Sequence, residues 1–133
     1  MSDRNKKTVM AYVDAFNRGD IDALLRQFTP DAVVSGVLGW GGLDKVKPIW
    51  QELIDCFNLT LQVESLVAEG NIVAVRYIER GKSVRSFRGG PVTGRPYEVV
   101  AMEWFEFRDR LICRRCGARD SAAMFRQMGL PLT

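Results

Sequence analysis

The chain has 133 residues, 47% apolar and 26% charged, which suits a single soluble domain over 1–133 with its own core. Its net charge of +3 comes from Lys and Arg spread along the chain, so we expect no nucleic-acid partner. No apolar run approaches the roughly 20 residues that cross a membrane, and no signal-peptide segment follows the polar start, which together predict a cytoplasmic protein with no membrane partner.

The chain contains no histidine, which excludes His-based acid–base chemistry, Ser-His-Asp triads and nearly all catalytic zinc sites. Its three cysteines, an odd number, favour reduced thiols. Cys113 and Cys116 form a C-x-x-C pattern inside a predicted strand, where residues three apart face opposite ways, so redox or metal chemistry is not expected there. We expect neither a metal nor an organic cofactor.

The first half of the chain has helical periodicity. Apolar residues recurring at three- and four-residue spacing predict helices over 4–18, 21–28 and about 43–57. Pro48 marks either a kink in the third helix or a later start for it. A short strand is predicted over 31–37, and the Gly-rich segment after it, which carries Trp40, is predicted to be a turn or a pocket lip.

The second half changes to alternating polarity, which predicts strands over 59–68, 72–87, 97–107 and 111–118. Gly81 is interpreted as a bulge, and 88–96 as a loop. A closing helix is predicted after Asp120. Helices segregated from antiparallel strands indicate an α+β fold, with a curved mixed or antiparallel sheet wrapped around three N-terminal helices and a short C-terminal helix.

Glu103 is the polar exception on the apolar face of the strand 97–107, whose other members on that face are Tyr97, Val99, Ala101, Phe105 and Phe107. A carboxylate in such a row must be desolvated, paired or protonated. Glu103 is therefore either a functional group or a structural carboxylate bonded to an Arg or a Tyr.

Two long segments carry a resemblance to a known family. AYVDAFNRGDIDALLRQFTPDAVV and TGRPYEVVAMEWFEFRDRLICRRCGARDSAAMFRQMGLP resemble the two ends of the α+β cone shared by ketosteroid isomerases, SnoaL-type polyketide cyclases and limonene epoxide hydrolases. The resemblance covers nearly the whole chain and is more specific for the fold than for the reaction. It implies a six-stranded curved sheet, a deep apolar pocket, and a homodimer through the outer sheet face, here Val100, Met102 and Trp104.

The resemblance to ketosteroid isomerases implies roles for two residues. Tyr12 matches the tyrosine that donates a hydrogen bond to the oxyanion, and Glu103 matches its acidic partner. The base of those isomerases falls near Gly36, which has no side chain, so their mechanism is not expected here.

The other two branches imply further candidates. Arg80 matches the arginine of the Arg-x-Asp pattern in limonene epoxide hydrolases, but Lys82 and Gly117 stand where acids are needed. Asp120 is the nearest match to the acid–base aspartate of SnoaL-type cyclases, and it is also a candidate helix N-cap.

Taken together, these residues predict acid–base catalysis of a cyclisation, isomerisation or dehydration on a small hydrophobic substrate that is carbonyl-bearing or polycyclic. Glu103 is the expected acid or base, Tyr12 the oxyanion donor and Arg80 the orienting cation, with Asp120 as a further candidate. The expected pocket residues are Phe16, Trp40, Trp50, Val99, Ala101 and Phe105.

Three points stay open at the level of sequence. Arg80, together with Arg76, is a candidate partner for Glu103. Arg115 and Arg119 are expected in solvent or at the pocket mouth. Epoxide hydrolysis, with Glu103 or Asp120 activating water, and a non-catalytic ligand-binding or dimerisation module are the alternative functions.

Overall fold

The computed structural model describes residues 2–36 and 39–132. Over these residues the elements follow one another in the order α1 (Ser2–Arg18), α2 (Ile21–Leu25), β1 (Phe28–Gly36), β2 (Gly39–Gly41), α3 (Leu43–Phe57), β3 (Thr60–Glu69), β4 (Ile72–Lys82), β5 (Pro96–Arg108), β6 (Leu111–Arg119) and α4 (Ser121–Met128).

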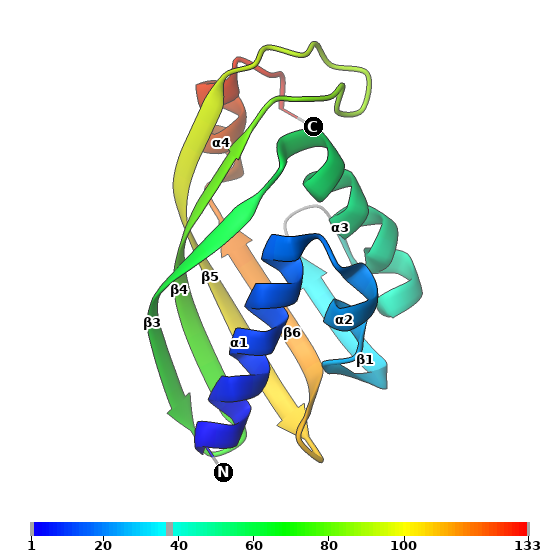
Figure 1. Cartoon of the computed structure of the whole chain (residues 1–133), viewed down its shortest axis with the longest axis vertical. Helices are drawn as coiled ribbons and strands as arrows, with labels where there is room; N and C mark the ends of the chain where they lie inside the picture. Colours follow the sequence, from blue (N-terminus) through cyan, green and yellow to red (C-terminus); the bar gives the residue numbers. More distant parts are fainter. Residues whose placement is uncertain (1, 37–38, 133) are drawn as a thin grey trace.

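The described strands form one six-stranded sheet in the order β2-β1-β6-β5-β4-β3. Only the pairing of β1 with β6 is parallel among these strands, so the sheet is mixed. Figure 1 shows the sheet curving around α1, α2 and α3, with α4 at the end of the molecule where the chain terminates. The predicted α+β class and the curved sheet around three N-terminal helices are confirmed.

The largest boundary differences lie at the end of β4 and around β1. The strand predicted over 72–87 ends at Lys82, because the Val84 N–H donates to the Cys56 carbonyl oxygen in α3 instead of to a neighbouring strand. The second helix was predicted to reach Phe28, but α2 ends at Leu25 and Phe28 already pairs with Ile112 of β6. Long-range pairing to β6 therefore overrides the helical spacing of this segment. The segment that forms β2 was predicted to be a turn or a pocket lip. It has only three residues, two of them glycines, and so carries no strand signal in the sequence.

Two interpretations of single residues are corrected. The helix α3 begins at Leu43 and includes Pro48, so a later start is wrong. Gly81 is not a bulge, since β4 pairs with β5 in continuous register there, opposite Tyr97. A Cβ at position 81 would overlap the Tyr97 ring and lie 2.9 Å from the Phe57 carbonyl oxygen, so the glycine makes room for that ring.

The two faces of β5 are as different as the alternation predicts. Its inner residues are buried and join the core, apart from the partly buried Glu103. On the outer face Val100, Met102 and Trp104 are 39%, 55% and 44% exposed.

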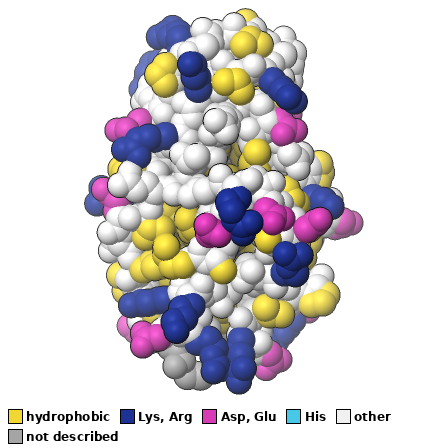
Figure 2. All heavy atoms as spheres, in the orientation of Figure 1, with side chains coloured by type: hydrophobic (Ala, Val, Ile, Leu, Met, Phe, Trp, Pro, Cys, Tyr) yellow, Lys and Arg dark blue, Asp and Glu magenta, His cyan; other side chains and the backbone are white. Residues whose placement is uncertain are grey.

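The rest of the surface bears on the expected partners. In the view of Figure 2, Lys and Arg side chains are scattered over the face, and Asp and Glu side chains lie beside some of them. None of the helices in 2–36 and 39–132 has the length and apolar character to span a membrane.

Candidate active site

A cavity of about 70 Å³ lies between α3 and the concave face of the sheet. The α3 wall is apolar and includes Val46, Ile49, Trp50 and Leu53. The sheet wall carries the polar groups, namely Tyr77, Glu79, Glu103, Arg115 and Arg119. This volume is well below the roughly 300–1,000 Å³ of most ligand pockets, so the cavity holds a small molecule or one end of a larger one.

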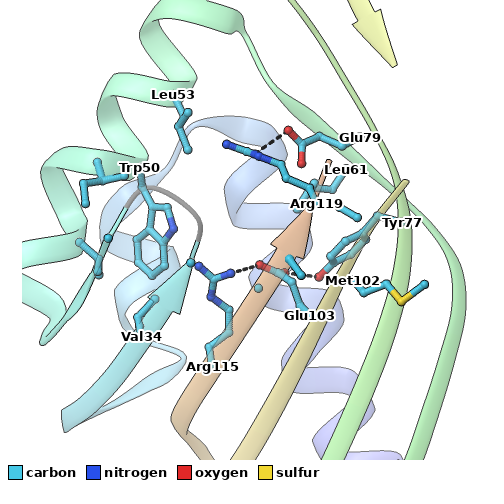
Figure 3. Close-up of a pocket in the computed structure, with 17 residues that line it drawn as sticks. Val34, Trp50, Leu53, Leu61, Tyr77, Glu79, Met102, Glu103, Arg115 and Arg119 are labelled. Carbon is cyan, nitrogen blue, oxygen red and sulfur yellow. Dashed lines mark hydrogen bonds and ion pairs between the residues drawn. The ribbon is translucent and has the colours of Figure 1, made fainter. Parts of the chain in front are cut away.

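Glu103 stands at one end of this cavity, where three side chains donate to its two carboxylate oxygens. Its Oε1 accepts from the Tyr77 hydroxyl at 2.7 Å. Its Oε2 accepts from the Tyr12 hydroxyl at 3.1 Å and forms an ion pair with Arg115 Nη1 (Figure 3). The Glu103 and Arg115 side chains are only 10% and 9% exposed, so the pair is largely desolvated.

The electrostatics keep the two tyrosines of this cluster protonated. Burial, followed by the charge of Glu103, raises the pKa of Tyr12 and of Tyr77 well above that of an ordinary tyrosine, so both remain hydrogen-bond donors. Burial lowers the pKa of Arg115, but the groups around it, first of all the Glu103 carboxylate, together outweigh burial, and the pKa is raised. The guanidinium is a permanent cation, and it also lies 5.8 Å from the centroid of the Trp50 ring.

Two glycines lie beside the Arg115 guanidinium, and Gly117 makes room for it. A Cβ at Gly117 would overlap Arg115 Nη1 and lie 3.4 Å from Glu103 Oε2. A Cβ at Gly36 would lie 3.5 Å from Arg115 Nη2, at ordinary contact distance. Both glycines stand at positions where the resemblance to related enzymes implies an acid. In this protein the Arg115 guanidinium fills the space beside both.

A second buried ion pair stands at the other end of the cavity (Figure 3). Glu79, 2% exposed, accepts at Oε2 from the Tyr97 hydroxyl and from Arg119 Nη1, both at 2.6 Å. Burial, followed by the charge of Glu79, raises the pKa of Tyr97, which therefore stays a donor. The cavity thus contains two carboxylates, each paired with its own arginine.

The structure brings together some of the predicted site residues. Tyr12 is bonded to Glu103, and Trp50 and Ala101 line the cavity. The core, rather than the cavity wall, holds Phe16, Val99 and Phe105. Trp40 lies in β2, and its side chain is outside the described part of the structure.

The prediction that Arg80 or Arg76 faces Glu103 is wrong. Arg80 is bonded to Glu98 at 2.7 Å and is 48% exposed, and Arg76 pairs with Glu64 and is 53% exposed. Strand alternation gives the reason: Tyr77 and Glu79 of β4 point inward, so the even-numbered positions point outward.

Asp120 is the N-cap of α4. Its Oδ1 accepts from the Ala123 backbone N–H at 2.9 Å, and its side chain does not line the cavity. The capping alternative is therefore correct, and the structure does not support a catalytic role for Asp120.

Three charged residues of the cavity, Glu79, Arg115 and Arg119, were not among the predicted site residues, although the sequence carried a signal for each. Glu79 continues the buried row Val73, Val75, Tyr77 on β4, as Glu103 does on β5. Arg115, Gly117 and Arg119 alternate on one face of β6, and the expectation that these arginines lie in solvent is wrong.

The curved mixed sheet, the helices inside its curve and the apolar cavity with buried polar groups define the nuclear-transport-factor-2-like class of α+β folds. Within that class the chain belongs to the SnoaL-like domain family, whose sequence profile matches residues 9–115.

Solved structures show the same fold. IdmH of Streptomyces antibioticus, a proposed polyketide cyclase, is 28% identical over 94% of this chain and 98% of its own, with a TM-score of 0.83. A proposed polyketide cyclase of Xanthomonas campestris is 26% identical over 96% and 98%, with a TM-score of 0.88. AclR of Streptomyces galilaeus, a proposed hydroxylase, is 21% identical over 97% and 98%, with a TM-score of 0.88, and so shares the fold alone. Among curated protein sequences, none matches this chain.

Proposed function

We propose that the protein binds a small hydrophobic carbonyl compound in this cavity and catalyses proton transfer on it, in a cofactor-free cyclisation, isomerisation or dehydration. The observation that carries the proposal is the Arg115 guanidinium, fixed by a buried carboxylate on the polar sheet wall of the cavity and facing an apolar wall on α3. A preorganised cation in such a place stabilises the negative charge that develops on a carbonyl oxygen. The similarity to proposed polyketide cyclases supports the same reaction class.

Arg115 is well placed to bind the oxygen. Its Nη1 is used by Glu103, whereas no described residue accepts a hydrogen bond from Nη2, which lies beside Gly36 on the cavity wall. The Tyr12 hydroxyl donates to Glu103 and is therefore not free for the substrate. We assign to Arg115 the binding of a carbonyl oxygen of the substrate, with Glu103 and Tyr12 as positioning residues.

The second candidate function is non-catalytic binding of a small ligand, which the modest cavity volume favours. Epoxide hydrolysis is less well supported. Arg80 faces solvent, Asp120 caps a helix, and the space beside Gly117 is occupied by a guanidinium.

A matched pair of probes tests carbonyl recognition. 2-Tetralone and tetralin differ only in the carbonyl group, and we expect 2-tetralone to bind at least about tenfold more tightly, as one hydrogen bond to a charged donor allows. Protein NMR titrations measure both affinities. The preference should fall in Arg115→Lys, which keeps the charge but loses the planar donor pair, and should persist in Arg80→Met. Equal affinities in the wild type would contradict the proposal.

We also propose a homodimer through the outer sheet face. A hollow of about 580 Å³ on this face is lined by Val67, Ala74, Met102, Trp104 and Ala118 among others, and exposed apolar surface of this kind commonly pairs with another chain. Light scattering after size exclusion should give twice the mass of one chain. Trp104→Glu should give a folded monomer, whereas Val92→Glu, at an exposed site in the 83–95 loop, should leave the dimer intact. A wild-type monomer at high concentration would exclude the dimer.

A further inference from the structure

The two carboxylates of the cavity, Glu103 and Glu79, differ in whether an oxygen is left without a hydrogen bond. Both oxygens of Glu103 accept hydrogen bonds. At Glu79 both bonds end on Oε2, and no described residue donates to Oε1. The fully enclosed polar atoms without a partner in the described chain are Thr29 Oγ1, Arg115 Nε, Arg119 Nε and Ser121 Oγ. Glu79 Oε1 is not one of them, and Glu79 lines the cavity, so this oxygen is open to a ligand.

We propose that Glu79 is the proton acceptor of the reaction and that Arg119 binds the carbonyl oxygen next to the carbon that loses the proton. This inference rests on the function proposed above. It gives the base, which that proposal does not assign, to Glu79, and it adds Arg119 as a second carbonyl-binding cation besides Arg115. Arg119 suits its part because its Nη1 holds Glu79 and no described residue accepts from its Nη2. One ion pair thus supplies both the base and the group that stabilises the product of deprotonation.

The proposed step conserves charge around Arg119. Glu79 Oε1 takes a proton from the carbon beside the carbonyl, the C–H electron pair becomes the C=C bond of an enolate, and the carbonyl π electrons move onto oxygen. The negative charge passes from Glu79 to that oxygen while both neighbour the same guanidinium. No unpaired charge arises in the apolar cavity, which lowers the cost of the step. In a β,γ-unsaturated carbonyl compound the enolate is a dienolate, and return of the proton from Glu79 to its γ-carbon completes an isomerisation.

Glu79 is held in position for this role. The Tyr97 hydroxyl donates to Oε2 at 2.6 Å and leaves Oε1 free. The Tyr97 ring fits against β4 because Gly81, its cross-strand neighbour, has no side chain. Tyr97 is therefore a positioning residue, and Gly81 provides its space.

The two arginines also define the class of substrate. Arg115 and Arg119 are four residues apart on β6, or about 13 Å of strand. Between them β6 places Gly117 on the cavity wall, opposite Glu103 of β5, and the facing wall on α3 is apolar. A compound with two carbonyl or hydroxyl oxygens separated by an apolar stretch fits this arrangement, with one oxygen at each guanidinium.

Hydrogen–deuterium exchange at the α-carbons of 2-tetralone tests the assignment. In D2O, with proton NMR as the readout, we expect the wild type to accelerate loss of the α-proton signal. Glu79→Gln should lower the protein-dependent rate by about 100-fold or more, the range for removal of a general base. Its affinity for 2-tetralone should stay within a few-fold. Arg80→Met, an exposed site, should exchange at the wild-type rate.

The outcomes separate the two proposals. Exchange that persists in a folded Glu79→Gln protein overturns the assignment of Glu79 and leaves the proposed function standing. A wild type that accelerates no exchange overturns both. Circular dichroism establishes folding, since Glu79→Gln leaves Arg119 buried without its partner. If that variant does not fold, Glu79→Asp decides, because it keeps the charge and withdraws Oε1 by one methylene. A wild-type rate in Glu79→Asp overturns the assignment, and a drop of about tenfold or more supports it.

Discussion

Replacement of Arg115 by methionine is expected to lower the free energy of unfolding by about 3–5 kcal/mol. The change leaves the Glu103 carboxylate buried with two tyrosine donors and no cation. A buried charge without a partner costs far more free energy than a charge that stays in water. The loss of unfolding free energy therefore exceeds the packing energy of the Arg115 side chain. Urea denaturation followed by tryptophan fluorescence measures the difference.

Two variants separate charge from packing. Arg80→Met removes an arginine from an exposed pair with Glu98 and should change the unfolding free energy by less than about 1 kcal/mol. The double variant Arg115→Met/Glu103→Leu removes both buried charges and should recover much of the stability lost in the single variant. A single variant within 1 kcal/mol of the wild type would show that the Glu103 carboxylate does not depend on Arg115.

The strand β5 shows what the sequence could establish. Its strict alternation separated an apolar face from an exposed one, and this single pattern located Glu103 among core residues. The family resemblance supplied Tyr12, which is bonded to Glu103. The alternation is a local signal, and the resemblance is a signal of the whole fold. Neither depends on the exact pairing of strands.

The partner of Glu103 could not be chosen in the same way. Two rows on β4 competed for the core: one holds Val75, Tyr77 and Glu79, the other Arg76 and Arg80. A charged residue on a strand is usually exposed, and for the same reason Arg115 and Arg119 were predicted to lie in solvent or at the pocket mouth. Only the register of β6 against β5 sets Gly117 opposite Glu103 and leaves a space that Arg115 fills.

Gly117→Ala is expected to have the second large effect. The new methyl group would overlap Arg115 Nη1 and lie 3.4 Å from Glu103 Oε2, so the guanidinium must shift from its position beside the carboxylate. Overpacking of a filled site typically costs about 1–3 kcal/mol, and the displaced ion pair adds to it. The variant should also lose the preference for 2-tetralone over tetralin, because the oxygen-binding donor has moved.

Gly36→Ala is the matched control for this prediction. It adds the same methyl group on the other side of the same guanidinium, 3.5 Å from Arg115 Nη2, at ordinary contact distance. We expect its unfolding free energy to change by less than about 1 kcal/mol, and its preference for the ketone to remain. If the two variants behaved alike, the role of Gly117 would be conformational and would not depend on Arg115. If only Gly117→Ala loses both unfolding free energy and the preference for 2-tetralone, the cation can stay in the cavity only because position 117 has no side chain. The site would then differ from the epoxide hydrolases in the sign of the charge next to the substrate.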